Sequence, residues 1–202
     1  YHSNNAPYER WSIAPPRLED IYNFEDALLV GSMLITFLRH CDRIKIACLA
    51  QLVNVIAPIF TQTGGGIFAQ TIFYPFEHLS NFGRGVALNP IISSPKYDCK
   101  AYTDVPFLES IATFDEENEE MTVFCVNKSM NEGMTLDVNL LDFDGYKPFE
   151  FISMDGYDKN DVNSFENPFV KPHNNPLPEL DDKTLTAQIK PFSWNVIRLK
   201  KM

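Results

Sequence analysis

The chain has 202 residues, 45% of them hydrophobic, which is enough to bury a core and to hold one domain or a fragment joined to a domain. Its net charge of -10 and pI near 4.8 argue against nucleic-acid binding, which needs clustered Lys and Arg. Residues 1–100 hold eight acidic and eight basic residues, whereas residues 101–202 hold nineteen and nine. We interpret the acidic half as a solvated surface, with a cation site as the lesser alternative.

The opening residues 1–22 combine Asn, Pro and aromatic residues without a sustained period, which predicts a long loop. Asn23, with Asp26 three residues on, forms a variant of the capping box and predicts an amphipathic helix that ends near Arg39. Residues 44–54 are short and almost wholly apolar, which is typical of a parallel strand buried on both faces.

Gln51 lies at the end of this predicted strand, before a loop with three glycines at 64–66 and a second predicted helix over 70–82. No Lys followed by Ser or Thr comes after the glycines, so they do not predict a phosphate-binding loop. The order loop, helix, strand, loop, helix is typical of the end of an α/β fold, and in a β/α barrel catalytic groups follow the carboxyl ends of strands. Residues 1–85 are therefore interpreted as a TIM barrel remnant, the last βα units of a barrel they cannot close alone.

From residue 86 the sequence changes to short β-rich runs separated by polar turns. Regular spacing of such runs predicts an all-β antiparallel sandwich, jelly-roll-like in type, over residues 86–202. Residues 155–182 read as a long irregular connection within it. The predicted strands are FLESIATF, MTVFCVN, MTLDVNLL, KPFEFISM, KTLTAQI and SWNVIRLK.

The cysteines show no CxxC pair and no His at zinc-finger spacing, so we expect no metal site and no cofactor. Free, mostly buried thiols at Cys41, Cys48, Cys99 and Cys125 fit a reducing compartment and favour the cytoplasm. No apolar run approaches the roughly 20 residues of a membrane span, so no membrane partner is expected. The chain begins without Met in a polar aromatic stretch, and we expect an upstream portion to precede Tyr1.

Three of the histidines are interpreted as structural or as lacking a second metal ligand. His40 ends a helix, where a cation is favoured, His173 lies in the irregular connection, and His78 has no partner at four-residue spacing. His2 lies in a loop expected to face a cleft. We weigh substrate contact by His2 as the minority alternative.

Carboxylates do not form a convincing catalytic pair, although retaining glycoside hydrolysis needs two about 5 Å apart. The acids of residues 19–26 cluster at a helix start, where they stabilise the N-terminus. The acidic run 115–120 is typical of a solvated hairpin turn, and we treat the sequon Asn127-Lys128-Ser129 as chance.

Long blocks of the chain resemble the family 51 glycoside hydrolases that are α-L-arabinofuranosidases. The resemblance covers most of the chain and is loose only over residues 115–180. The blocks are WSIAPPRLEDIYNFEDALLVGSMLITFLRH, DRIKIACLAQLVNVIAPI, QTIFYPFEHLSNFGRGVALNP, ISSPKYD, DVPFLESIA and SWNVIRL.

In that family a β/α barrel carries two glutamates, an acid/base after strand four and a nucleophile after strand seven, beside a C-terminal sandwich. The reaction is retaining hydrolysis of terminal α-L-arabinofuranosyl groups from arabinan or arabinoxylan fragments. The family's nucleophile stretch would run directly into Tyr1, so the resemblance implies that both glutamates lie upstream and that this chain alone is inactive.

The resemblance also implies which residues contact an arabinofuranosyl-containing oligosaccharide. Gln51 corresponds to a residue that hydrogen-bonds at the glycone pocket, and its amide both donates and accepts. Tyr1 and His2 begin a loop that belongs to the same site. Trp11 is either a pocket wall or a packing residue, and the sequence leaves both open.

Two hypotheses follow. In the first, the chain is the C-terminal fragment of a retaining arabinofuranosidase; in the alternative, it is a noncatalytic β-sandwich module for carbohydrate binding or assembly. The alternative would be supported by an exposed row of Trp or Tyr, and none has clear spacing. In a detached fragment the apolar faces of residues 24–38 and 44–60 would lack partners, so we expect association, domain swapping or partial disorder. The expected partners are the missing upstream barrel portion and, in a homo-oligomer, further copies of the chain.

Overall fold

Two helices form in the described part of the chain. The computed structural model describes residue 13 and residues 19–202, and its helices are α1 (Phe24–Arg39) and α2 (Phe73–Phe82). The predicted capping box is confirmed: Asn23 Oδ1 accepts from the Asp26 backbone N–H at 3.0 Å, and Asp26 Oδ2 accepts from the Asn23 N–H at 3.1 Å. Neither helix is long and apolar enough to cross a membrane.

The remaining elements are short strands, and their pairings within named strands are antiparallel. Their bounds are β1 (Ile59–Thr61), β2 (Ile67–Ala69), β3 (Val86–Leu88), β4 (Lys96–Tyr97), β5 (Val105–Pro106), β6 (Leu108–Asp115), β7 (Glu120–Asn127), β8 (Met134–Asn139), β9 (Tyr146–Met154), β10 (His173–Asn174), β11 (Glu179–Asp181), β12 (Thr184–Ile189) and β13 (Ser193–Lys201).

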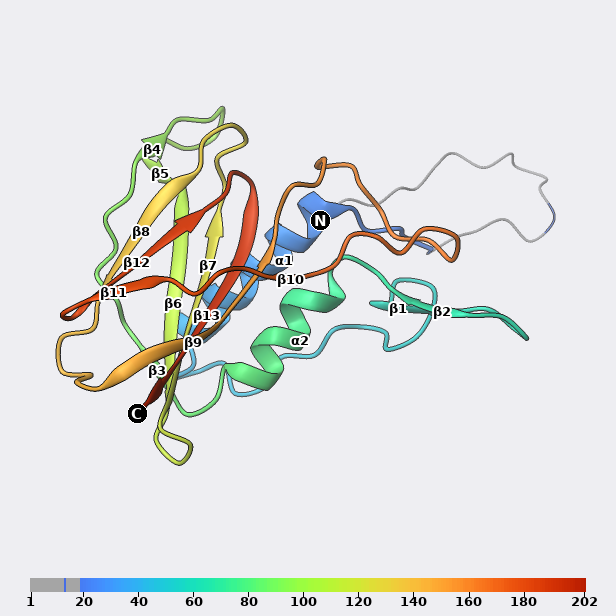
Figure 1. The fold of residues 1–202 in the computed structure, drawn as a ribbon. Helices are drawn as coiled ribbons and strands as arrows, with labels where there is room; N and C mark the ends of the chain where they lie inside the picture. Colours follow the sequence, from blue (N-terminus) through green and yellow to red (C-terminus); the bar gives the residue numbers. More distant parts are fainter. Residues whose placement is uncertain (1–12, 14–18) are drawn as a thin grey trace.

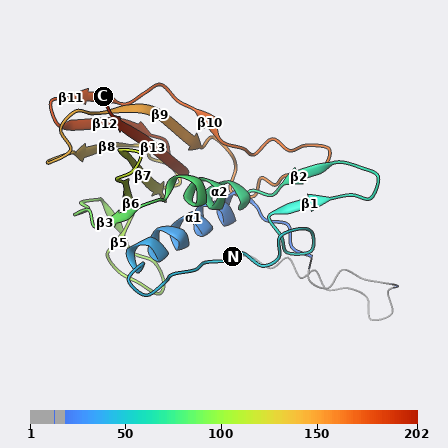
Figure 2. The same cartoon turned by 90° about the horizontal axis from the view of Figure 1, so that it is seen from below.

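The fold has three layers, which Figures 1 and 2 show from two directions. A six-stranded sheet in the order β10-β9-β13-β7-β6-β3 forms the middle layer. A three-stranded sheet in the order β11-β12-β8 lies on one face of it, and α1 lies on the other face with α2 beside it. The hairpin β1–β2 projects away from the sandwich (Figure 1). The predicted antiparallel β architecture is therefore confirmed.

The six-stranded sheet has a hydrophobic core on each face, and successive side chains of its central strands point into one core and then the other. In β7, Val123 and Cys125 face the three-stranded sheet, whereas Phe124 and Val126 face α1. Because α1 and the second sheet exclude water from opposite faces, β7 is buried along almost its whole length. This double burial explains why the run VFCV within β7 is continuously apolar instead of alternating.

The core next to α1 is built around Trp194, which is fully buried. Gly31 of α1 lies directly under this indole: a Cβ at position 31 would be 2.6 Å from Trp194 Cε3. On its other side α1 packs against α2 through a small cluster that includes Tyr22, Val30, Leu34 and Ile72. The helix is thus held between the sheet and α2.

The six predicted strands of the sandwich are all observed, as β6, β7, β8, β9, β12 and β13. The acidic run 115–120 closes the β6–β7 hairpin as predicted, and in the turn Asp115 Oδ1 accepts from the backbone N–H groups of Glu117 and Asn118. The Asn118 side-chain amide also donates to Asp115 Oδ2 at 2.8 Å, and this bond first, then the backbone bonds, lowers the pKa of Asp115. The irregular connection 155–182 contains only the short strands β10 and β11.

The prediction of a buried parallel strand at residues 44–54 is wrong for this structure. These residues form no named strand, and only an isolated parallel bridge joins Val53 to Ile59. Ile46 is 83% exposed and Leu52 is 72% exposed. A buried parallel strand needs paired neighbours, and among the described residues this segment has no ladder partner beyond that bridge.

The expectation that the thiols are mostly buried is also wrong. Cys41, Cys48 and Cys99 are exposed, and only Cys125, in β7, is buried. Cys41 and Cys48 belong to the segment that follows α1, which gains no cover once the strand at 44–54 does not form. All four thiols are free, as expected.

Candidate functional site

Gln51 lies in a loop whose backbone is held by hydrogen bonds on its C-terminal side. Asn54 adopts a left-handed conformation (φ 60°), in which its backbone N–H donates to Ile59 O at 2.8 Å and its Oδ1 accepts from Thr61 N at 2.7 Å. Asn tolerates this conformation better than other non-glycine residues. Val55 shares it (φ 65°) although it is β-branched, and its carbonyl accepts from Asp20 N at 3.0 Å. Such strained positions gather at binding sites.

A buried amide ties this loop to the start of α1. Gln70, 1% exposed, donates from Nε2 to Ala57 O at 2.7 Å and to Asp20 O at 3.2 Å, and its Oε1 accepts from Tyr22 N at 2.8 Å. Thr71 continues the network, since its hydroxyl donates to Asn23 O at 2.6 Å. Three segments distant in sequence are thereby fixed to one another.

The Gln70 network is a feature that the sequence reasoning missed. The sequence predicts that Gln70 begins the second helix, but α2 begins three residues later, and the Gln70 side chain instead binds the backbone of the loop. The available signal was a polar amide inside the apolar run IFAQTIF, because a buried polar side chain needs partners.

Of the predicted substrate contacts, the structure describes Gln51 alone. Gln51 is exposed and lies in the loop, not at the end of a strand as predicted. Tyr1, His2 and Trp11 lie outside the described residues, so their grouping with Gln51 stays a prediction. The triple glycine forms the tip of the β1–β2 hairpin, where Gly64 has a φ of 67°.

The three described histidines make structural contacts. His78 is buried, and its Nδ1 accepts from Trp194 Nε1 at 3.0 Å; burial lowers the pKa of this imidazole to about 4. His40 ends α1, with its ring nitrogen 3.0 Å from Arg43 Nη2. His173 lies 3.4 Å from the buried carboxylate of Asp155. Among the described residues no group of three or more His, Cys, Asp and Glu could hold a metal ion.

The sequon is closed to modification by its packing. Asn127 is fully buried, and its Nδ2 donates to Glu132 O at 3.0 Å and to Lys190 O at 2.9 Å. Its Oδ1 accepts from Ser129 N at 3.0 Å. The amide thus organises the loop after β7, which agrees with treating the sequon as chance.

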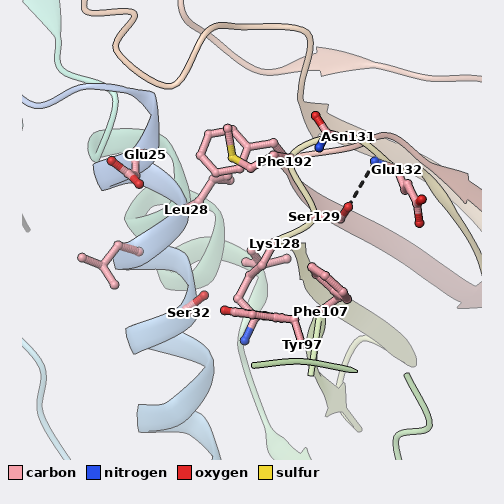
Figure 3. A pocket seen from close by; sticks show the side chains of 13 residues that line it. Glu25, Leu28, Ser32, Tyr97, Phe107, Lys128, Ser129, Asn131, Glu132 and Phe192 are labelled. Carbon is pink, nitrogen blue, oxygen red and sulfur yellow. Dashed lines mark hydrogen bonds between the residues drawn. The ribbon is translucent and has the colours of Figure 1, made fainter. Parts of the chain in front are cut away.

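Among the hollows on the surface of the described residues are two that adjoin the helices. The larger, of about 780 Å³, lies between α1 and the loop after β7 and is called here the helix–sheet groove (Figure 3). The smaller, of about 400 Å³, lies between α2 and the segment that carries Gln51 and is called the α2 cleft. The α2 cleft is lined by Ala47, Cys48, Leu49, Leu52, Pro58, Ile59, Phe73, Phe76, Glu77, Ser80 and Asn81.

Comparison with known families decides what this arrangement belongs to. A family described as the α-L-arabinofuranosidase C-terminal domain matches residues 1–193. The chain belongs to this family. The match extends over both the helical part and the sandwich, so the predicted resemblance is confirmed.

Relatives of this α-L-arabinofuranosidase domain include two intracellular exo-α-(1→5)-L-arabinofuranosidases. The protein from Bacillus subtilis is 52% identical and that from Halalkalibacterium halodurans is 54% identical, each over 100% of this chain. The chain spans 40% of the length of each. It therefore corresponds to a minor part of proteins of this kind.

Solved structures agree on the fold. A family 51 α-L-arabinofuranosidase from Bifidobacterium longum superposes with a TM-score of 0.83 at 36% identity, over 95% of this chain and 38% of that one. A family 51 enzyme from Thermotoga petrophila gives a TM-score of 0.81 over 93% of this chain and 40% of that one; at 22% identity it supports the fold alone.

Proposed function

We propose that this chain is the C-terminal part of a retaining α-L-arabinofuranosidase that releases terminal arabinofuranosyl groups from arabinan or arabinoxylan oligosaccharides. The observation that carries the proposal is the family match over residues 1–193, together with alignment of the whole chain to 40% of the length of enzymes named for this activity. Those relatives are named intracellular, and we propose the same location here. The catalytic glutamates belong to the upstream portion, so the chain alone does not hydrolyse.

In this proposal residues 1–85 are the last units of a (β/α)8 barrel and residues 86–202 are a jelly-roll-like sandwich beside it. The exposed apolar side chains at Ile46 and Leu52 support it, because they are the kind of surface that a neighbouring strand covers. The α2 cleft adjoins Leu52, and burial raises the pKa of Glu77 at its edge. The upstream portion would cover this surface.

Gln51 is proposed to hydrogen-bond the sugar next to the nucleophile, with Gln70 as a positioning residue. The support is the fixed geometry on the C-terminal side of Gln51: the Gln70 amide binds the carbonyls of Ala57 and Asp20, and the Asn54 backbone N–H donates to Ile59 O. A side chain that hydrogen-bonds a sugar in a fixed geometry needs a rigid backbone beneath it.

The test is hydrolysis of a chromogenic α-L-arabinofuranoside by the chain alone and after mixing with a separately expressed upstream portion. Activity in the mixture alone is expected. Gln51→Ala should lower kcat/KM in the mixture roughly 10- to 100-fold, since a lost hydrogen bond at a sugar contributes about 1–3 kcal/mol. Gln62→Ala in the exposed β1–β2 turn is the matched control. Hydrolysis by the chain alone would overturn the proposal.

The alternative, a noncatalytic carbohydrate-binding or assembly module, is favoured by one observation, the helix–sheet groove with its aromatic rings. Association as a homo-oligomer is supported by the same exposed apolar residues, Ile46 and Leu52, as the barrel contact. Light scattering on the isolated chain distinguishes a monomer from an oligomer, and a uniform monomer would contradict self-association.

A further inference from the structure

The helix–sheet groove has the chemistry of a ligand site. Its volume of about 780 Å³ falls in the range of roughly 300–1,000 Å³ that is usual for small-molecule pockets. Figure 3 shows Leu28 and Ser32 of α1 on one side and Lys128, Asn131 and Glu132 on the other. None of its lining residues belongs to the segment 44–58 that carries Gln51.

An aromatic pair forms one end of the groove. The rings of Tyr97 and Phe107 are 4.6 Å apart between centroids and inclined by 34°. They are held by the β4–β5 hairpin, in which Phe107 N donates to Pro95 O at 3.0 Å. Both side chains are half-buried, so an apolar ring surface stays open to a ligand. Flat rings of this kind pack against the C–H faces of a sugar.

The opposite wall is a loop that is already organised. Glu132 N donates to Ser129 Oγ at 3.1 Å, and Asn127 Nδ2 donates to Glu132 O at 3.0 Å. These bonds fix the backbone while the side chains of Asn131 and Glu132 form no hydrogen bond with another described residue. An amide with two donors and an acceptor beside a carboxylate is suited to vicinal hydroxyl groups. A preformed wall lowers the entropy that binding costs.

The charge balance argues against an anionic ligand. Glu132 lines the groove, and the only cation among the described lining residues is Lys128, whose Nζ lies 3.7 Å from Glu109 Oε1. A phosphate would therefore meet the Glu132 carboxylate and an ammonium that already has a partner. A neutral polyhydroxylated ligand meets no such repulsion.

We propose that the helix–sheet groove binds a neutral oligosaccharide, stacked on Tyr97 and Phe107 and hydrogen-bonded by Asn131 and Glu132. The choice of an arabinose-containing sugar rests on the proposed function; the preference for a neutral sugar rests on the groove itself. Such a site would hold a stretch of polysaccharide on the protein and raise the local concentration of cleavable ends.

Met130 gives a local reporter, because it lines the groove and is half-exposed. The full chain, labelled with ¹³C at the methionine methyl groups, has six signals, and Met130→Leu assigns the one that matters. Titration with α-(1→5)-linked arabinotriose should shift the Met130 signal saturably and leave that of Met202, at the exposed C-terminus, unchanged. Inorganic phosphate should produce no shift.

Two variants test the contacts. Tyr97→Leu and Asn131→Ala should each raise the Kd at least about 10-fold, while Tyr102→Leu, an exposed tyrosine outside the groove, should not change it. Asn131 is exposed, so its variant stays informative even where Tyr97→Leu unfolds the chain. Absence of a saturable shift, or an unchanged Kd in Asn131→Ala, would overturn the proposal.

Two further measurements separate this site from the proposed function. In the mixture with the upstream portion, Asn131→Ala should leave hydrolysis of the small chromogenic substrate unchanged, because that substrate does not reach the groove. Loss of arabinotriose binding on adding the upstream portion would show that polypeptide covers the groove and would overturn the proposal. Failure of the mixture to hydrolyse would count against the proposed function and leave the titration result intact.

Discussion

The central sheet and the segment 44–58 are similarly apolar in sequence but differ in structure. β7 is buried along almost its whole length, between two antiparallel neighbours and two covering layers. The segment 44–58 forms no strand before Ile59 and leaves Ile46 and Leu52 exposed. The difference lies in what surrounds each run: the partners of β7 all come from this chain, whereas the described residues offer none to the other segment.

This comparison shows that an apolar run specifies a strand only together with the edges it pairs with. The two regions also differ in what stabilises them. The sandwich, α1 and α2 bury their apolar side chains against one another, whereas the loop after α1 is held by hydrogen bonds such as those of Asn54 and Gln70. Substitutions in the two regions should therefore differ in their effects on the isolated chain.

Trp194→Ala should give the largest effect, because it empties the core between α1 and the sheet. The indole is fully buried, stacks against Phe124 and donates a hydrogen bond to His78. Truncation of a buried Trp costs about 3–5 kcal/mol, so the free energy of unfolding should fall by that amount in urea titrations. Tyr102→Ala, at a 72% exposed position, is the control. If Trp194→Ala lowered the free energy of unfolding no more than the control does, the core between α1 and the sheet would not be what stabilises the isolated chain.

His78 makes the same core sensitive to acid. Burial lowers the pKa of His78 from 6.5 to about 4, so between these pH values the imidazole is protonated in the unfolded chain and neutral in the folded chain. The stability that neutral His78 contributes is fully present above pH 6.5. As the pH falls to about 4, the free energy of unfolding should decrease by on the order of 3 kcal/mol. Urea titrations between pH 7 and 4 measure this slope. His78→Gln keeps an acceptor for Trp194 and should reduce the slope; an unchanged slope would contradict the assignment.

Gly31→Ala tests how tightly α1 fits the sheet. The new methyl group would lie 2.6 Å from a ring carbon of Trp194, and overpacking of this kind costs about 1–3 kcal/mol. The gain in helix propensity, about 1 kcal/mol, opposes it in part, so a net loss of up to about 2 kcal/mol is expected. A double-mutant cycle with Trp194→Leu supplies the check: Gly31→Ala should become neutral or stabilising there. A persistent loss would mean that the helix, not the contact, is at fault.

Much of the fold was predictable from sequence because its signals are local. The capping box at Asn23, the hairpin turn at 115–120 and the spacing of the sandwich strands depend on residues close in sequence, and all were confirmed. The strand at 44–54 and the burial of Cys48 were wrong, since both assumed neighbours from outside the described residues.

The candidate site was less predictable, because its supports are distant in sequence. Gln70 joins residues 13 and 50 positions away, and the groove brings Ser32, Tyr97 and Asn131 together from three elements. The hydrophobic periodicity of a sequence carries no information about contacts between residues so far apart. Gln51 could be named from a family resemblance, yet its grouping with Tyr1, His2 and Trp11 stays a prediction, since those three lie outside the described residues.

Leu52→Ala should have the smallest effect on this chain and the most instructive one on the mixture. Leu52 is 72% exposed, so removing its side chain should change the free energy of unfolding of the isolated chain by less than about 0.5 kcal/mol. If the upstream portion covers it, the same change removes about 1.5–3 kcal/mol of burial from their contact, which corresponds to roughly a 10- to 100-fold higher Kd for association. Leu177→Ala, at an exposed position in the irregular connection, should leave both quantities unchanged. Equal Kd values for the two variants would mean that the 44–58 segment is not the contact surface, and the contrast with β7 would then need another cause than missing neighbours.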